Sequence, residues 1–202
     1  MKPAWNLLNR VALFLWIVGG VSAGDVPGWR RVGNARQDFE ISLDRETRRR
    51  GNASGRLECI VKRSTGIGTL EQDFTPEAYL GQRIRLTAWL KGENAGRAML
   101  FMRTENDSGQ VLEFGNTQDH AFHGTFEWRK TEIVLDVSPK STVVQMGLIL
   151  DGSGKAWMDD VSIEVVDKHV KSTANFRGPG PANPRRAGIF VDHPPQNLDF
   201  EQ

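Results

Sequence analysis

Several runs of the sequence alternate between polar and apolar residues. On the polar face of these runs lie two arginines, two aromatic residues and a glutamine. Arg85 and Trp89 share one such run, Phe101 and Arg103 share the next, and Gln145 lies in a later one. An aromatic ring can stack on the apolar face of a sugar, while arginine and amide groups hydrogen-bond its hydroxyls. Brought together, these five side chains would form a saccharide-binding patch.

A hairpin would bring the two halves of this patch together. Residues 83–91 and 97–103 both have a period of two, and Gly92-Glu93-Asn94-Ala95-Gly96 between them has the composition of a turn. If the two runs pair through that turn, Trp89 and Phe101 point to the same side. The alternative is that loops cover this face, in which case Trp89 is a packing residue.

The same period of two recurs along most of the chain, with turn residues between the runs. No long amphipathic helix is predicted after residue 23, and about eight short strands at sandwich-like spacing are expected between residues 38 and 167. Residues 24–37 form a lead-in. The sequence therefore predicts an all-β fold, an antiparallel β-sandwich of jelly-roll type.

Both ends of the chain differ from this middle part. Residues 1–23 have a basic start, a short apolar run and the small residues Val21-Ser22-Ala23, which is typical of a cleaved signal peptide. The prediction is a secreted or periplasmic protein with no membrane span after cleavage.

Residues 168–202 are rich in proline and glycine and are expected to be extended and poorly packed. Their last residues echo Gln37-Asp38-Phe39-Glu40, so they either dock as an added edge strand or begin a second, similar module; the second account is slightly favoured.

Charge and motifs narrow the classes of function that the sequence allows. The formal net charge is +1 with both signs interspersed, so no basic field for nucleic acid is predicted. The one cysteine allows no internal disulfide. No nucleophile elbow, phosphate-binding glycine loop or metalloprotease helix occurs in the sequence. A binding protein is therefore favoured over an enzyme.

Four segments resemble a known group of modules. They are Asp38-Phe39-Glu40-Ile41-Ser42-Leu43-Asp44-Arg45, residues 79–91, Gly124-Thr125-Phe126-Glu127-Trp128, and Trp157-Met158-Asp159-Asp160-Val161. This set resembles the galactose-binding-like jelly-roll modules that include the CenC-type carbohydrate-binding modules, found in bacterial secreted or regulator-fused proteins. The resemblance is more specific for the fold than for the ligand.

The resemblance also implies a metal ion. Related modules often hold a structural Ca²⁺ between an acid of the opening strand and one of the closing strand, which here indicates Glu40 and Asp160, helped by carbonyls of residues 50–55. The alternative is that the paired acids Asp159 and Asp160 cap backbone groups or face solvent.

Together these features predict a non-catalytic module that binds carbohydrate or cell-envelope glycan. Its partner would be that glycan, bound reversibly on the aromatic and arginine patch. Two alternatives stay open: a structural or protein-interaction module of the envelope, and a glycan hydrolase, which would need two carboxylates in one cleft.

Overall fold

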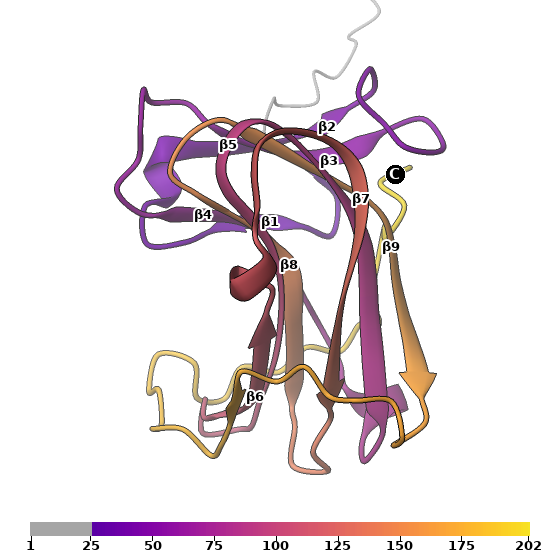
Figure 1. Cartoon of the computed structure of the whole chain (residues 1–202). Coiled ribbons are helices and arrows are strands. Elements are labelled where there is room, and N and C mark those ends of the chain that lie inside the picture. Colours follow the sequence, from indigo (N-terminus) through magenta and orange to yellow (C-terminus); the bar gives the residue numbers. More distant parts are fainter. Residues whose placement is uncertain (1–25) are drawn as a thin grey trace, which may run out of the picture.

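The computed structural model describes residues 26–202, so the predicted signal peptide at 1–23 lies outside the described residues. The described chain forms two antiparallel layers with short 3₁₀ turns between strands (Figure 1). The elements are β1 (Arg30–Val32), η1 (Arg36–Asp38), β2 (Phe39–Asp44), β3 (Ser54–Cys59), β4 (Ile67–Phe74), η2 (Glu77–Tyr79), β5 (Arg83–Glu105), β6 (Val111–Asn116), η3 (Gln118–His120), β7 (Phe122–Asp136), β8 (Val143–Asp151), β9 (Lys155–Val166) and β10 (Phe176–Arg177). The predicted antiparallel β-sandwich is confirmed.

One strand, β5, belongs to both layers. Its first part pairs with β7 on one edge and with β9 on the other. Strand β9 pairs in turn with β3, and β3 with β2; these five strands form the first layer. The last part of β5 pairs with β8 on one edge and with β6 on the other. Strand β8 pairs in turn with β4, and β4 with β1, while β10 pairs with β6; these strands form the second layer. In Figure 1, β5 and β7 both bend over the top of the view, where the layers meet.

The core lies between the layers and follows the alternation of β5. Even-numbered residues face it on both sides of the bend: Ile84, Leu86, Ala88, Leu90, Ala98, Leu100 and Met102 are all fully buried. They pack against residues of β4 and β8 such as Leu70 and Leu148. The inward and outward sets predicted for residues 83–91 and 97–103 are therefore those observed.

The predicted hairpin is wrong. Residues 92–96 do not turn back but continue β5, with Gly92 opposite Phe126 and Ala95 opposite Gly124. Register shifts on both sides of these residues let the strand bend from one layer into the other. Gly92 is required there, because a Cβ at this position would lie 2.2 Å from the Phe126 ring.

The tail is packed against the sandwich, contrary to the expectation of a poorly packed extension. Phe176 and Arg177 add the short edge strand β10 to β6. Phe200 is fully buried, and its ring stacks on Trp29 with a centroid separation of 5.1 Å. Trp29 Nε1 also donates to the Asn197 carbonyl at 3.0 Å. Both the lead-in and the tail thus contribute to the core.

Within residues 26–202, no helix has the length and apolar character needed to cross a membrane.

Replacing Phe200 by alanine should lower the free energy of unfolding by about 3–5 kcal/mol, because a fully buried ring would leave a cavity beside Trp29. Urea denaturation monitored by tryptophan fluorescence measures the change. Phe190→Ala is the matched control, since that ring is 79% exposed and its loss should cost little. Equal effects of the two substitutions would contradict the described packing of the tail.

Asp136 should make stability depend on acid pH. Hydrogen bonds from the Arg83 guanidinium, with Lys168 2.8 Å away, lower the pKa of Asp136 to about 2. Its contribution is present above the ordinary carboxyl range and is lost as the pH falls toward 2. Asp136→Asn should cost about 1 kcal/mol at neutral pH, after solvent screening, and progressively less as the pH falls through 2.

Denaturation of both proteins across this pH range tests the effect. Asp167→Asn serves as the control, because the exposed Asp167 carboxylate accepts a hydrogen bond from the His169 amide and lies 3.9 Å from the His169 ring, with no arginine or lysine paired to it within residues 26–202. A destabilisation by Asp136→Asn that stays constant with pH would rule out the ion pair as its cause.

Candidate functional site

The five predicted patch residues lie on two different faces. Arg85 and Trp89 project from the first layer, where their strand neighbours are on β7 and β9. Phe101, Arg103 and Gln145 project from the outer face of the second layer, where Arg103 lies opposite Gln145 and their side chains are hydrogen-bonded. The prediction of a single patch is therefore wrong, because it depended on the hairpin that does not form.

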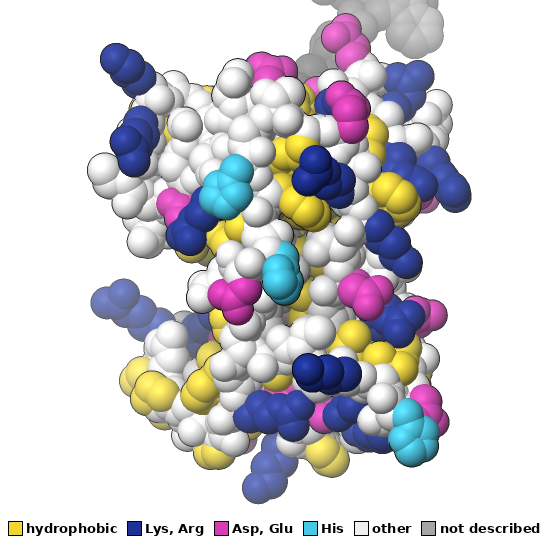
Figure 2. All heavy atoms as spheres, viewed as in Figure 1, with side chains coloured by type: hydrophobic (Ala, Val, Ile, Leu, Met, Phe, Trp, Pro, Cys, Tyr) yellow, Lys and Arg dark blue, Asp and Glu magenta, His cyan; other side chains and the backbone are white. Residues whose placement is uncertain are grey.

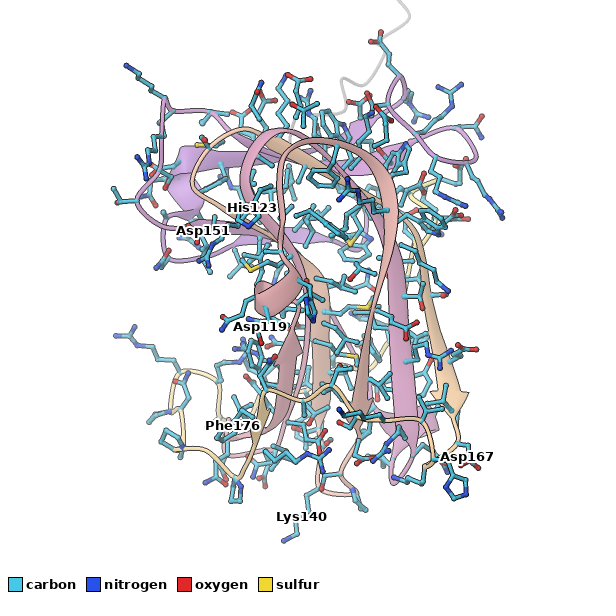
Figure 3. All side chains as sticks on the ribbon, viewed as in Figure 1. Asp119, His123, Lys140, Asp151, Asp167 and Phe176 are labelled. Carbon is cyan, nitrogen blue, oxygen red and sulfur yellow. The ribbon has the colours of Figure 1, made fainter. Side chains whose placement is uncertain are left out.

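A groove runs across the outer face of the second layer and contains two of these predicted residues. Its floor holds a small apolar cluster of Met99, Phe101 and Ile149, which are 4–7% exposed, with Phe114 packed against them. The groove encloses about 400 Å³ and is completed by Val32, Gly33, Ile67, Thr69, Glu71, Arg97, Arg103, Asn116, Gln118 and Asp151. Figure 2 shows an indentation at the left edge of the molecule, and Figure 3 labels Asp151 above it and Phe176, the strand partner of Phe114, below it.

The charged residues that line the groove are all paired within the protein. Arg30 Nη2 lies 2.6 Å from Glu71 Oε1, Arg97 Nε donates to Asp151 Oδ2 at 3.0 Å, and Arg103 Nε lies 3.1 Å from Glu105 Oε1. Burial raises the pKa of Glu71 and lowers that of Arg103. One hydroxyl is different: Thr69 Oγ1 is buried and has no hydrogen-bond partner.

The tail closes one end of this face. Residues 178–196, called the strap here, leave β10 and reach β4, where the Thr75 amide donates to the His193 carbonyl at 2.9 Å. Arg186 of the strap donates to Glu105 Oε2 at 2.5 Å and lies 3.9 Å from Asp73. Glu105 is only 1% exposed, so Arg186 and Arg103 neutralise a buried acid. The strap is thus attached beside the groove by charge.

Trp89 faces outward but its ring is occupied. The Arg49 guanidinium carbon lies 3.7 Å from the ring centroid, and the same guanidinium pairs with Asp160. Arg85 pairs with Glu164 at 3.0 Å. Trp89 lines an open depression with Arg50, Lys130 and Asp160 among others, yet the face of its ring is already in contact with a cation. This arrangement leaves less of the ring for a sugar than the prediction required.

The predicted metal pair is not brought together. Glu40 lies opposite Glu58, and Glu58 lies opposite Lys155, whereas Asp160 is five residues further along β9, or about 16 Å. Asp160 pairs with Arg49, and Asp159 accepts hydrogen bonds from the Arg49 and Arg50 amides at 2.7 and 3.1 Å. These contacts match the alternative in which paired acids cap backbone groups. In the part of the chain that the structure describes, no group of three or more His, Cys, Asp or Glu residues is placed to hold a metal ion.

Several groove residues were not predicted. Thr69 and Glu71 alternate with core residues of β4, and Ile149 and Asp151 continue the outward set of β8 to which Gln145 belongs. The alternation of inward and outward residues along β4 and β8 could therefore have predicted these groove residues from the sequence. Phe114 is placed at the groove by the pairing of β6 with the last part of β5, which local sequence does not reveal.

Solved structures with the same fold include carbohydrate-binding modules. The chain aligns with the CBM22-1 xylan-binding domain of Paenibacillus barcinonensis Xyn10C at a TM-score of 0.55 and 13% identity, covering 71% of this chain and 89% of that one. The C-terminal family 22 carbohydrate binding module of Clostridium thermocellum Xyn10B aligns at 0.50 and 13% identity, covering 73% and 91%. The enzymatically active domain of bacteriophage CBA120 tailspike protein 4 aligns at 0.55 and 11%, covering 70% of this chain but 20% of that one. Identities this low show a shared fold alone.

A closer likeness in sequence is to a curated bacterial protein. The uncharacterized HTH-type transcriptional regulator YbfP of Bacillus subtilis (strain 168) is 37% identical over 177 residues, which cover 87% of this chain. The chain spans 57% of the length of that relative. No family model matches the sequence.

Removing the Arg186 side chain should loosen the strap, because the charge-assisted bond to buried Glu105 would be lost. Arg186→Ala should speed hydrogen exchange about tenfold at the Gly188 and Thr75 amides, which bond to Asp107 and His193 carbonyls. Arg185→Ala is the matched control, because its exposed side chain makes no hydrogen bond or ion pair within residues 26–202. Unchanged exchange in Arg186→Ala would show that the ion pair does not hold the strap.

Proposed function

We propose that the chain is a non-catalytic saccharide-binding module and that the groove on the second layer is its site. The observation that carries this proposal is the groove itself: an apolar floor of Met99, Phe101 and Ile149 bordered by amide and hydroxyl groups. Apolar faces of a sugar ring pack on such a floor, while its hydroxyls exchange hydrogen bonds with the rim. Phe101 and Arg103 keep the role predicted for them, whereas Arg85 and Trp89 do not take part and the buried Gln145 does not line the groove.

The electrostatics of the groove favour an uncharged ring. Because Glu71, Arg97 and Arg103 already have ionic partners, a charged group over the floor would have to displace one of them. A sugar hydroxyl displaces nothing, and the buried, unpartnered Thr69 Oγ1 would gain a hydrogen bond to it once the side chain turned toward the groove. Affinity should be modest, since few polar contacts become desolvated.

The comparisons support this proposal at the level of the fold. Two of the similar structures are carbohydrate-binding modules, and one of them is named as xylan-binding. The finer assignment to a CenC-type module rests on the four segments that resemble that group. The likeness to part of YbfP, which is named as a transcriptional regulator, supports a regulatory role for this binding. We place the module outside the cytoplasm, because residues 1–23 have the pattern of a signal peptide.

The carboxylates of the groove do not suit glycan hydrolysis. Ile67 lies opposite Asp151, and Glu71 is four residues further along β4, so the backbone positions of the two acids are about 13 Å apart along the strands. Glycosidases place their two carboxylates roughly 5–10 Å apart. Each of these acids is also held by an arginine. Binding without turnover is therefore the favoured activity.

Glycan-array screening followed by calorimetry with the best neutral oligosaccharide, with xylohexaose as the first probe, tests the site. Phe114→Ala should weaken binding about tenfold, because the ring borders the apolar floor and stacking contributes about 1–1.5 kcal/mol. Thr69→Val, which keeps the shape, should weaken it by a smaller factor. Trp89→Ala is the control on the other face and should leave affinity unchanged.

Two results would count against the proposal. If no saccharide on the array binds, the function is wrong. If Trp89→Ala abolishes binding while the groove variants retain it, the function stands but the site is on the first layer.

A further inference from the structure

A second depression adjoins the groove and shares two of its residues. It encloses about 750 Å³ and is lined by Arg63, Ser64, Thr65, Gly96, Arg97, Asp151, Gly152 and Ser153. Arg97 and Asp151 also line the groove, so the two hollows lie on either side of this ion pair. A ligand longer than one sugar ring in the groove would extend into the depression.

The floor of the depression is made of glycine backbone. A Cβ at Gly96 would lie 2.2 Å from the Asp151 carbonyl oxygen, so the two loops are in direct contact and no side chain fits between them. At Gly152, with φ of +93°, a Cβ would meet only the Gly96 Cα at 3.9 Å, so the space above it is open. The His123 ring, seen beside Asp151 in Figure 3, holds this region by bonding to the Gly96 carbonyl at 2.8 Å. The depression is thus an open, preformed hollow.

Charge distinguishes the depression from the groove. Arg63 is exposed and makes no ion pair or side-chain hydrogen bond within residues 26–202. The other two charges, on Arg97 and Asp151, cancel each other. The depression therefore carries one uncompensated positive charge, next to the hydroxyls of Thr65 and Ser153, whereas the charges lining the groove are compensated.

We infer that the depression binds the acidic substituent of a saccharide whose neutral rings lie in the groove. A guanidinium pairs with a carboxylate or phosphate through charge-assisted hydrogen bonds, and the neighbouring hydroxyls complete the coordination of its oxygens. The ligand class is then an acidic glycan, with a uronate carboxylate or a phosphate at one end. This inference rests on the proposed function of the groove and adds the chemistry of the second subsite.

Matched oligosaccharides that differ only in one acidic group test the inference. Calorimetry would compare xylopentaose with a xylo-oligosaccharide of similar length carrying one glucuronate, together with neutral and phosphate-bearing glycans on an array. The wild-type chain should bind the acidic member at least about tenfold more tightly at low salt, and the preference should shrink as salt screens the charge. Arg63→Ala should abolish the preference and change the neutral affinity by a smaller factor, and Arg63→Lys should retain part of the preference.

Lys62→Ala is the matched control, because Lys62 is the exposed neighbour of Arg63 but does not line the depression. Equal affinity of the wild-type chain for neutral and acidic members would overturn the inference and leave the proposed function standing. Equal loss of preference in Lys62→Ala and Arg63→Ala would also overturn it, since it would show a diffuse field rather than a subsite. If no glycan of either kind binds, the proposed function fails and the inference with it.

Discussion

The hydrogen bonding of β5 on both of its edges, in two different layers, is the constraint on which the remaining structure depends. From Arg83 to Glu93 the strand is paired with β7 and β9, and from Arg97 to Glu105 with β8, so it joins the layers covalently. Because the even-numbered side chains face the core on both sides of the bend, the odd-numbered ones face outward on both layers. Arg85 and Trp89 thereby belong to one surface, and Phe101 and Arg103 to another.

The groove follows from the second half of this strand. Outward side chains of β5 and β8 form its floor, and those of β4, next in the same layer, add Thr69 and Glu71 at its border. Three arginines, two of the sheet and one of the strap, accompany the buried acids at one end, and the unpaired Arg63 lies at the other. Charge is therefore compensated in the groove and not in the adjoining depression. This difference is the physical basis for expecting a neutral ring in the groove and an acidic group in the depression.

Sequence alternation was sufficient for the fold class and for the direction of individual side chains, because both depend on a period of two. It could not show which strands are neighbours. Gly92 to Gly96 have turn composition, yet they serve a bend within one strand, where Phe126 leaves no space for a side chain at Gly92. Distance along a strand was equally hidden, so Glu40 and Asp160 were placed together although Glu58 and Lys155 show them to be well apart. The proline-rich composition of the tail predicted an extended, poorly packed segment, and nothing local reveals that Phe200 contacts Trp29.

That contact sets a practical limit on how the domain can be divided. The ring of Phe200 fills a socket formed in part by Trp29, and a Cβ at Gly55 would strike the same ring at 2.4 Å. A fragment that ended at Val166, where the last long strand stops, would leave this socket open and expose apolar surface to water. Such a fragment should aggregate. A soluble fragment of this domain must therefore include both Trp29 and Phe200.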